Sequence, residues 1–199
     1  MTEADNARDW GLMARLAADD ESALDEILSR WEQPVLTFIH RQLGRRGAPD
    51  AEDLALEVFW RVYEARRSAR PTGSFPAWLF RIAYNLCVDY SRKRNRLARE
   101  ISFEDLANGS PGAALEPPAP ASHQPDTRAL NRELAEHLEE ALGRLPENQR
   151  AALVLCKIEG LSYQEIAAAL GCSISSVEAL LFRARRNIQA QMAPYLRGH

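Results

Sequence analysis

The stretch "GLSYQEIAAALGCSISSVEALLFRARRNI", Gly160–Ile188, shows two runs of helical apolar spacing that meet at a Gly-Cys-Ser junction. Ser162 with Glu165, and Ser175 with Glu178, each match the S-x-x-E pattern that caps a helix N-terminus. A glycine at the junction suits the left-handed residue with which many helices end. The stretch therefore predicts two short helices joined by a tight turn, which is a helix-turn-helix.

The second predicted helix has two different faces. The inward positions on a helical wheel are apolar: Val177, Leu181, Ala184 and Ile188. The outward positions are Ser175, Ala179, Phe182, Arg183 and Arg186. Small side chains at the start of a helix suit base edges, and the arginines that follow suit phosphates. A helical hairpin that only packs would explain the apolar face but not the arginines, so we predict a DNA-reading helix.

The charge of the chain is uneven. The formal net charge is -3, and residues 1–34 hold nine acidic and three basic side chains. Residues 81–99 hold six basic side chains and one acidic one, and residues 181–199 hold four arginines and no acid. Two local basic patches can bind phosphate although the whole chain is acidic. We expect the acidic N-terminal region to discourage premature contact with DNA.

The rest of the chain predicts an all-α protein. Both sides of the stretch 107–127 show helical spacing and none of the alternation typical of strands. This stretch contains five prolines and no apolar periodicity, which indicates a partly extended linker. We therefore predict two small helical domains joined by a Pro-rich flexible linker, of which the C-terminal one is the helix-turn-helix.

Several classes of protein are disfavoured. No apolar run approaches the ~18–20 residues of a membrane span, and the acidic N-terminus is unlike a signal peptide. The three cysteines are far apart and lack the spacing of a zinc site, so we expect reduced thiols in a cytoplasmic protein. We expect no cofactor and no metal.

A second nucleic-acid signal lies in "SFPAWLFRIAYNLCVDYSRKRNR", residues 74–96. It contains the aromatic residues Phe75, Trp78, Phe80, Tyr84 and Tyr90, followed by the basic residues Arg92, Lys93, Arg94 and Arg96. Rings that stack on bases and cations that hold the backbone are typical of single-stranded DNA binding. Trp78 and Phe80 taken alone favour a core role, but the adjacent basic residues favour DNA. One chain with both signals predicts a protein that finds and melts DNA.

At this point the sequence resembles a known family. "DAEDLALEVFWRVYEARR", "SFPAWLFRIAYNLCVDYSRKR" and "LPENQRAALVLCKIEGLSYQEIAAALGCSISSVEALLFRARRNI" resemble bacterial RNA polymerase sigma factors of the extracytoplasmic-function (ECF) group of the sigma-70 superfamily. The resemblance implies sigma region 2 at 10–97, a linker at 98–128 and sigma region 4 at 129–196.

The resemblance also implies partners. Region 2 would bind the beta-prime clamp helices of core RNA polymerase and recognise and open the minus-ten element of promoter DNA. Region 4 would bind the beta flap and read the minus-thirty-five element. The chain would be an alternative sigma factor for transcription initiation and not an enzyme. The group often has an anti-sigma factor, and the sequence leaves open whether this chain has one.

By position, the resemblance assigns roles to single residues. It implies polymerase binding by Asp53, Leu54, Glu57 and Phe59. It implies minus-ten binding by Arg67, Thr72, Ser74, Phe75, Trp78, Arg81, Asn85, Arg92, Lys93 and Arg94. It implies minus-thirty-five binding by Ser175, Ser176, Glu178, Ala179, Phe182, Arg183 and Arg186. The chain departs from the family at Leu56, where glutamine is frequent, and at Glu178 and Ala179, where basic or hydroxyl side chains are frequent.

Two other interpretations remain. A free-standing activator could also end in a helix-turn-helix, but a receiver or ligand domain is missing from the pattern. An enzyme on nucleic acid could hold magnesium with Asp50, Glu52 and Asp53. Stabilisation of a helix N-terminus explains these carboxylates more simply. Binding to core polymerase, followed by run-off transcription, separates the three interpretations.

Overall fold

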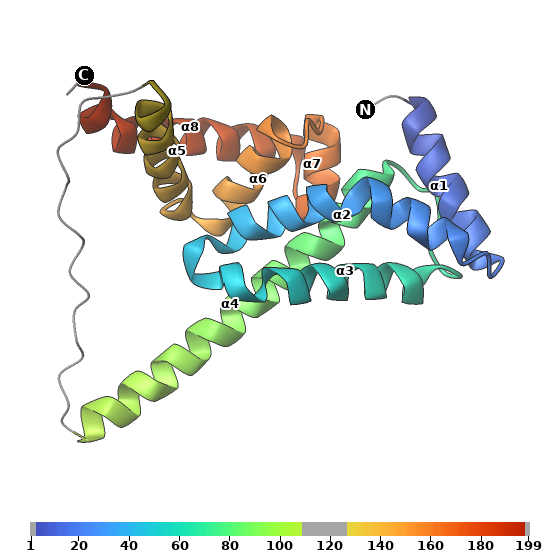
Figure 1. The fold of residues 1–199 in the computed structure, drawn as a ribbon, viewed down its shortest axis with the longest axis horizontal. Coiled ribbons are helices and arrows are strands. Elements are labelled where there is room, and N and C mark those ends of the chain that lie inside the picture. Colours follow the sequence, from blue (N-terminus) through green and yellow to red (C-terminus); the bar gives the residue numbers. More distant parts are fainter. Residues whose placement is uncertain (1–2, 109–126, 198–199) are drawn as a thin grey trace.

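The computed structural model describes residues 3–108 and 127–197, which fold as α-helices with one short 3-10 helix (Figure 1). The elements are α1 (Glu3–Ala17), α2 (Ser22–Leu43), η1 (Arg45–Asp50), α3 (Ala51–Ala65), α4 (Phe75–Asn108), α5 (Thr127–Gly143), α6 (Glu147–Lys157), α7 (Tyr163–Leu170) and α8 (Ile174–Arg197). The predicted all-α fold is confirmed.

A proline such as Pro34 fits the first turn of a helix, but it does not mark the start of α2. The helix instead runs through Pro34 without a break. Its buried side chains Ala23, Ile27, Val35 and Phe38 line one side of the helix on both sides of the proline. Because this stripe packs against α1, α3 and α4, the burial outweighs the main-chain hydrogen bond that proline cannot donate.

Helix α4 extends past the predicted boundary at 97 between region 2 and the linker. It begins at Phe75 and continues to Asn108, so residues 98–108 of the predicted linker have helical backbone. Its last turns extend beyond the other helices (Figure 1). Most of the Pro-rich stretch, residues 109–126, lies outside the described residues.

The predicted helix-turn-helix is present as α7 and α8, whose axes bend by 97°. Ser162 and Glu165 form the complete capping box at the start of α7, as predicted. Gly171 ends α7 in the left-handed conformation, with φ 64° and ψ 39°, which a glycine adopts without the steric cost of a Cβ. No single helix among the described residues is long and apolar enough to cross a membrane.

The second predicted capping box, Ser175 with Glu178, is wrong. Helix α8 begins at Ile174, so Ser175 already lies inside its first turn. The Ser173 hydroxyl oxygen instead accepts a hydrogen bond from the Ser176 N–H at 3.2 Å. The serine just before the helix takes the capping role because its oxygen faces the free N–H groups of the first turn.

The N-terminal helices α1–α4 and the C-terminal helices α5–α8 pack against each other. In Figure 1, α2 runs between α3 on one side and the C-terminal helices on the other, and α7 lies on α4. One continuous cluster of buried side chains includes Phe38 and Phe80 from the first half and Leu155 and Ile166 from the second. In this structure the two predicted domains therefore share a hydrophobic core.

Arg150 on α6 contributes a buried polar connection between the halves through its bond to Gln42. It is only 7% exposed and donates hydrogen bonds to the main-chain carbonyls of Gln42, Gly143 and Leu145. The Gln42 side chain in turn donates to the Glu147 carbonyl at 2.9 Å. Buried donors and acceptors that are paired in this way are costly to separate unless water replaces the partners.

Candidate nucleic-acid and partner interfaces

Helix α3 presents an apolar surface with acidic neighbours. Leu56 is 69% exposed and Trp60 is 57% exposed, on the same side of the helix as Asp53 and Glu57. These side chains line an open hollow between α3 and the start of α2. Glu21, just before α2, also lines this hollow. Exposed large apolar side chains with a polar rim are typical of a protein-binding surface.

The predicted clamp-binding residues divide into two groups here. Asp53 is exposed and Glu57 is half-buried and bonded to Arg61 at 3.0 Å. Leu54 is half-buried and Phe59 is 6% exposed, so these two support the surface from the core.

Sequence reasoning missed Trp60 and treated Leu56 only as a departure from the family. The signal was present as an apolar pair at i and i+4 on the polar side of an amphipathic helix. Together the two side chains give α3 an apolar surface in place of the expected polar contact.

The turn between α3 and α4 carries several predicted minus-ten residues. Arg67 is paired with both carboxylate oxygens of Asp19 at 2.9 Å, and Thr72 is exposed. The Ser74 hydroxyl donates to the Glu165 carboxylate of α7 at 2.6 Å. Burial tends to raise the pKa of Glu165, but hydrogen bonds from Ser74 and Ser162 outweigh it and lower the pKa.

A small hollow of about 120 Å³ opens beside this turn. Its lining residues are Trp10, Thr72, Gly73, Ser74, Ala77, Trp78, Arg81 and Ala168. Four predicted minus-ten residues are thus brought together, with α1 and α7 adding walls that the sequence did not reveal. Trp78 is half-buried, while Arg81 and Asn85 are exposed on α4.

Phe75 corrects the expectation of a ring offered to a base. Its side chain is 0% exposed and packs against Trp10, Trp31 and Trp78, with ring centroids 5.5 to 5.8 Å apart. Phe80 is also 0% exposed, as its core interpretation predicted. The burial of both rings stabilises the start of α4 and leaves Trp10 and Trp78 as the aromatic side chains that line the hollow.

The basic end of α4 remains largely open. Arg92 and Lys93 are exposed, and Arg92 lies 3.9 Å from Asp89 in an exposed pair. Arg94 is half-buried, with its guanidinium 5.6 Å from the centre of the Tyr90 ring. The exposed cations are free to contact phosphate, since exposed ion pairs are weak.

Helix α8 presents its predicted DNA face to solvent. Ser175, Ser176, Glu178, Arg183 and Arg186 are exposed, Phe182 is 61% exposed and Ala179 is half-buried. On the opposite side Val177, Leu181 and Ala184 are at most 1% exposed. The wheel prediction of an inward and an outward face is confirmed.

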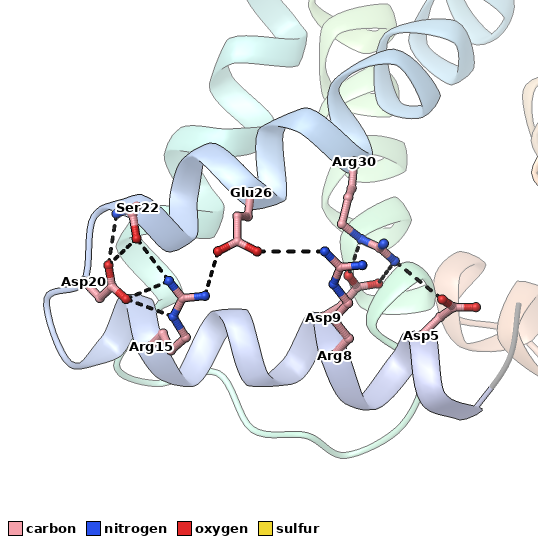
Figure 2. Close-up of polar contacts among 8 residues, drawn as sticks. All are labelled: Asp5, Arg8, Asp9, Arg15, Asp20, Ser22, Glu26 and Arg30. Atoms are coloured by element: carbon pink, nitrogen blue, oxygen red, sulfur yellow. Dashed lines mark hydrogen bonds and ion pairs between the residues drawn. The ribbon is translucent and has the colours of Figure 1, made fainter.

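Several acidic side chains of the N-terminal region pair with its own arginines (Figure 2). Asp9 is 0% exposed and bonded to Arg30 at 2.8 Å, while Arg15 contacts both Asp20 and Glu26. This pairing fixes α1 on α2, while the region keeps its excess of acidic over basic side chains.

These features define a class of protein. A helix-turn-helix with an exposed arginine face, and a second helical half that has an apolar binding surface and a basic aromatic helix, define a DNA-binding protein that works with a protein partner. The sigma-70 region 2 profile matches residues 27–97, and the sigma-70 region 4 profile matches residues 135–188. The chain belongs to the sigma-70 family, in the ECF group. It is an alternative sigma factor, which initiates transcription with RNA polymerase.

Curated relatives carry the same description. The "ECF RNA polymerase sigma factor SigE" of Mycolicibacterium smegmatis is 36% identical over 182 residues, which cover 90% of this chain and 66% of that protein. The "ECF RNA polymerase sigma-E factor" of Escherichia coli K12 is 29% identical, over 95% of this chain and 96% of its own length.

Solved structures show the same fold. CnrH, in complex with the cytosolic domain of CnrY, has a TM-score of 0.65 and 24% identity, covering 94% of this chain and 97% of that one. The sigma factor RpoE, in complex with the anti-sigma factor NepR from Bartonella quintana, has a TM-score of 0.61 and 25% identity. It covers 85% of this chain and 96% of that one.

Proposed function

We propose that the α3 surface binds the beta-prime clamp helices of core RNA polymerase. The observation that carries this proposal is the exposure of Leu56 and Trp60 beside Asp53 and Glu57. Interface hot spots are enriched in tryptophan, and acidic neighbours give orientation to a basic partner. Residues 98–128 then act as the linker. Residues 129–196 act as sigma region 4, which binds the beta flap of polymerase.

The turn before α4 and the exposed side of α4 recognise the minus-ten element. A base that leaves the stack costs a few kcal/mol, so the protein must offer contacts in return. The hollow beside Thr72, Ser74 and Trp78 offers hydroxyl groups and a ring, and Arg81 offers a cation. The exposed Arg92 and Lys93 hold the backbone of the melted strand.

Helix α8 reads the minus-thirty-five element in the major groove. Ser175 and Ser176 stand at the start of the helix, where base edges are read. Arg183 and Arg186 follow on the same exposed face. Glu178 is exposed on α8 and bonded to no capping group, which favours contact with a base that donates a hydrogen bond, such as cytosine.

Promoter binding requires the two halves to separate. The two promoter elements lie about 25 base pairs apart, which is about 85 Å of duplex. Ser74 beside the minus-ten hollow touches Glu165 of the helix-turn-helix at 2.6 Å. One chain cannot contact both promoter elements while Ser74 touches Glu165. We therefore call the described structure, in which the two halves are packed together, the closed state.

An anti-sigma factor is a further proposed partner. The solved RpoE structure holds the anti-sigma factor NepR, and its fold matches this chain. A partner that binds the closed state would keep the polymerase and DNA surfaces from acting together. The proposed location is the cytoplasm, where polymerase works, and the proposed role is regulatory and not enzymatic.

The test uses the full chain, core polymerase and a promoter template. The wild-type chain is expected to bind core polymerase and to direct run-off transcription. Leu56→Ser with Trp60→Ser is expected to weaken core binding at least tenfold, because burial of each side chain contributes about 1.5–3 kcal/mol.

The matched control is Leu97→Ser, which removes another exposed leucine, 45% exposed on α4. Circular dichroism checks that helix content is retained. Unchanged core affinity in the double variant would contradict the assignment of the α3 surface.

A further inference from the structure

Helix α1 is held rigidly on α2. Leu12, Met13 and Leu16 are at most 3% exposed, and the buried Asp9 carboxylate accepts from the Arg30 guanidinium at 2.8 Å. Figure 2 shows a second connection at the other end of α1, where Arg15 contacts Glu26 at 2.7 Å. A buried ion pair together with apolar packing fixes the position of α1 along α2.

Two side chains of α1 reach the turn before α4. The Trp10 ring N–H donates to the Gly73 carbonyl at 2.9 Å, and the Asn6 side-chain amide donates to the same oxygen at 3.3 Å. The Asn6 side-chain oxygen accepts from the Phe75 main-chain N–H at 2.7 Å. The amide nitrogen and the amide oxygen of Asn6 are thus both bonded to the main chain of the turn, and only one amide hydrogen is left over.

The Phe75 N–H lies in the first turn of α4, where a helix offers no acceptor of its own and a residue just before the helix usually supplies one. Here the cap comes from Asn6, 69 residues earlier in the chain. Gly73 has a φ of 142°, which L side chains rarely adopt, so the backbone of this turn depends on a glycine at that position. The Trp10 ring also packs edge-on against the Phe75 ring, with centroids 5.5 Å apart.

The other end of the same turn meets the end of α1. Asp19, directly after α1, binds the Arg67 guanidinium through both oxygens at 2.9 Å. The turn 66–74 is therefore held at both ends by α1 and the residues that follow it.

The contact with α7 differs, because Glu165 leaves Ser74 when the halves separate. Asn6 and Trp10 belong to the same half as the turn, so separation of the halves is expected to leave their bonds in place.

We propose that α1 is a brace that shapes the minus-ten turn, with Asn6 and Trp10 as its positioning residues. They act through the main chain of Gly73 and Phe75 and set where Thr72, Ser74 and Trp78 meet an unstacked base. Both residues lie outside the segment 27–97 that matches sigma-70 region 2. The proposal rests on the proposed minus-ten role of the turn.

The first experiment measures amide hydrogen exchange of the full chain without DNA. Asn6→Ala is expected to speed exchange at Phe75 about two- to twelvefold, as the loss of one hydrogen bond implies. Asn6→Asp keeps an acceptor for the Phe75 N–H and is expected to retain protection. Ala14→Gln, on the exposed side of α1, is the control and is expected to change nothing. If the rate of amide hydrogen exchange at Phe75 is the same in Asn6→Ala as in wild type, α1 does not hold the turn and the proposal is refuted.

The second experiment measures transcription by the polymerase holoenzyme from promoters with each base at each minus-ten position. Trp10→Phe keeps the ring but loses the donor to Gly73, and it is expected to lower discrimination at one position about two- to twelvefold. Affinity for core polymerase is expected to stay at the wild-type value.

The outcomes separate this proposal from the proposed function. Lower activity on all promoters with unchanged discrimination would overturn the positioning role. A wild-type chain that gives no promoter-directed transcript would refute the proposed function, and the exchange measurement would still decide whether α1 holds the turn.

Discussion

At the scale of single residues, α8 separates side chains that can reach DNA from those that hold the helix in place. Arg183 and Arg186 are exposed, while Ala184 between them is 0% exposed. The Arg186 guanidinium lies 5.8 Å from the centre of the Phe182 ring, and the Arg183 side chain bonds back to the Ala179 carbonyl at 3.1 Å. Both cations are thus pre-positioned on the outward face.

Arg183→Ala is predicted to weaken binding of minus-thirty-five DNA. If the side chain reads a base, the cost is about 1–3 kcal/mol and discrimination falls at one position. If it contacts only phosphate, the loss is uniform across sequences and the salt slope falls by about one. Titrations of holoenzyme with duplexes of varied sequence and salt distinguish the two.

Arg185→Ala is the matched control, since Arg185 is exposed but lies nearer to the buried side of the helical wheel. Its effect on affinity is expected to be smaller. A binding curve for Arg183→Ala that matches wild type in affinity, discrimination and salt slope would place this residue outside the interface.

At the scale of elements, the turn between α3 and α4 joins the helix proposed to bind polymerase to the helix proposed to melt DNA. Exchange of residues 68–74 for the corresponding turn of another ECF sigma factor is predicted to transfer minus-ten preference. The physical reason is that Thr72 and Ser74 line the hollow, while the supporting helices stay unchanged. Transcription from promoters with every minus-ten base measures the preference.

The exchanged turn must keep glycine at position 73, because its φ of 142° strains other residues. Core binding serves as the control and is expected to be unchanged. If preference stays with the original helix, specificity belongs to Trp78, Arg81 or Asn85, and the turn is only a connector.

At the scale of the whole molecule, the closed packing of the two halves predicts that opening is required for activity. Ser74→Cys with Glu165→Cys, in a chain with alanine at Cys156 and Cys172, allows a reducible bis-maleimide to join α7 to the turn. The joined chain is predicted to lose transcription from promoters with both elements, because their separation of about 85 Å cannot be spanned. Reduction of the cross-link is expected to restore transcription.

The control is a chain with Ser29→Cys and Gln33→Cys, in which the same reagent joins two exposed positions of α2. This chain is expected to keep its activity after cross-linking. Full transcription by the joined Ser74–Glu165 chain before reduction would show that the closed packing is compatible with promoter binding.

The sequence by itself determined the helix-turn-helix and the outward arginine face of its second helix. Ser162, Glu165 and Gly171 act within a few residues of themselves, so their roles follow from local hydrogen bonding and backbone conformation. The two faces of α8 likewise follow from the helical repeat alone. The cap of α8 was predicted wrongly: the S-x-x-E pattern pointed to Ser175, whereas Ser173, just before the helix start, accepts the bond from the Ser176 N–H.

Only the tertiary structure decided which distant residues meet. Asn6 caps α4 across 69 residues, Ser74 meets Glu165 across 91, and Gln42 meets Glu147 across 105. The exposure of Trp60 and the burial of Phe75 have the same origin. Both side chains are large, apolar and part of a helix, so whether each is exposed or buried depends on which helix packs beside it. Sequence periodicity gives the direction of a side chain on its own helix but not the neighbours that cover it.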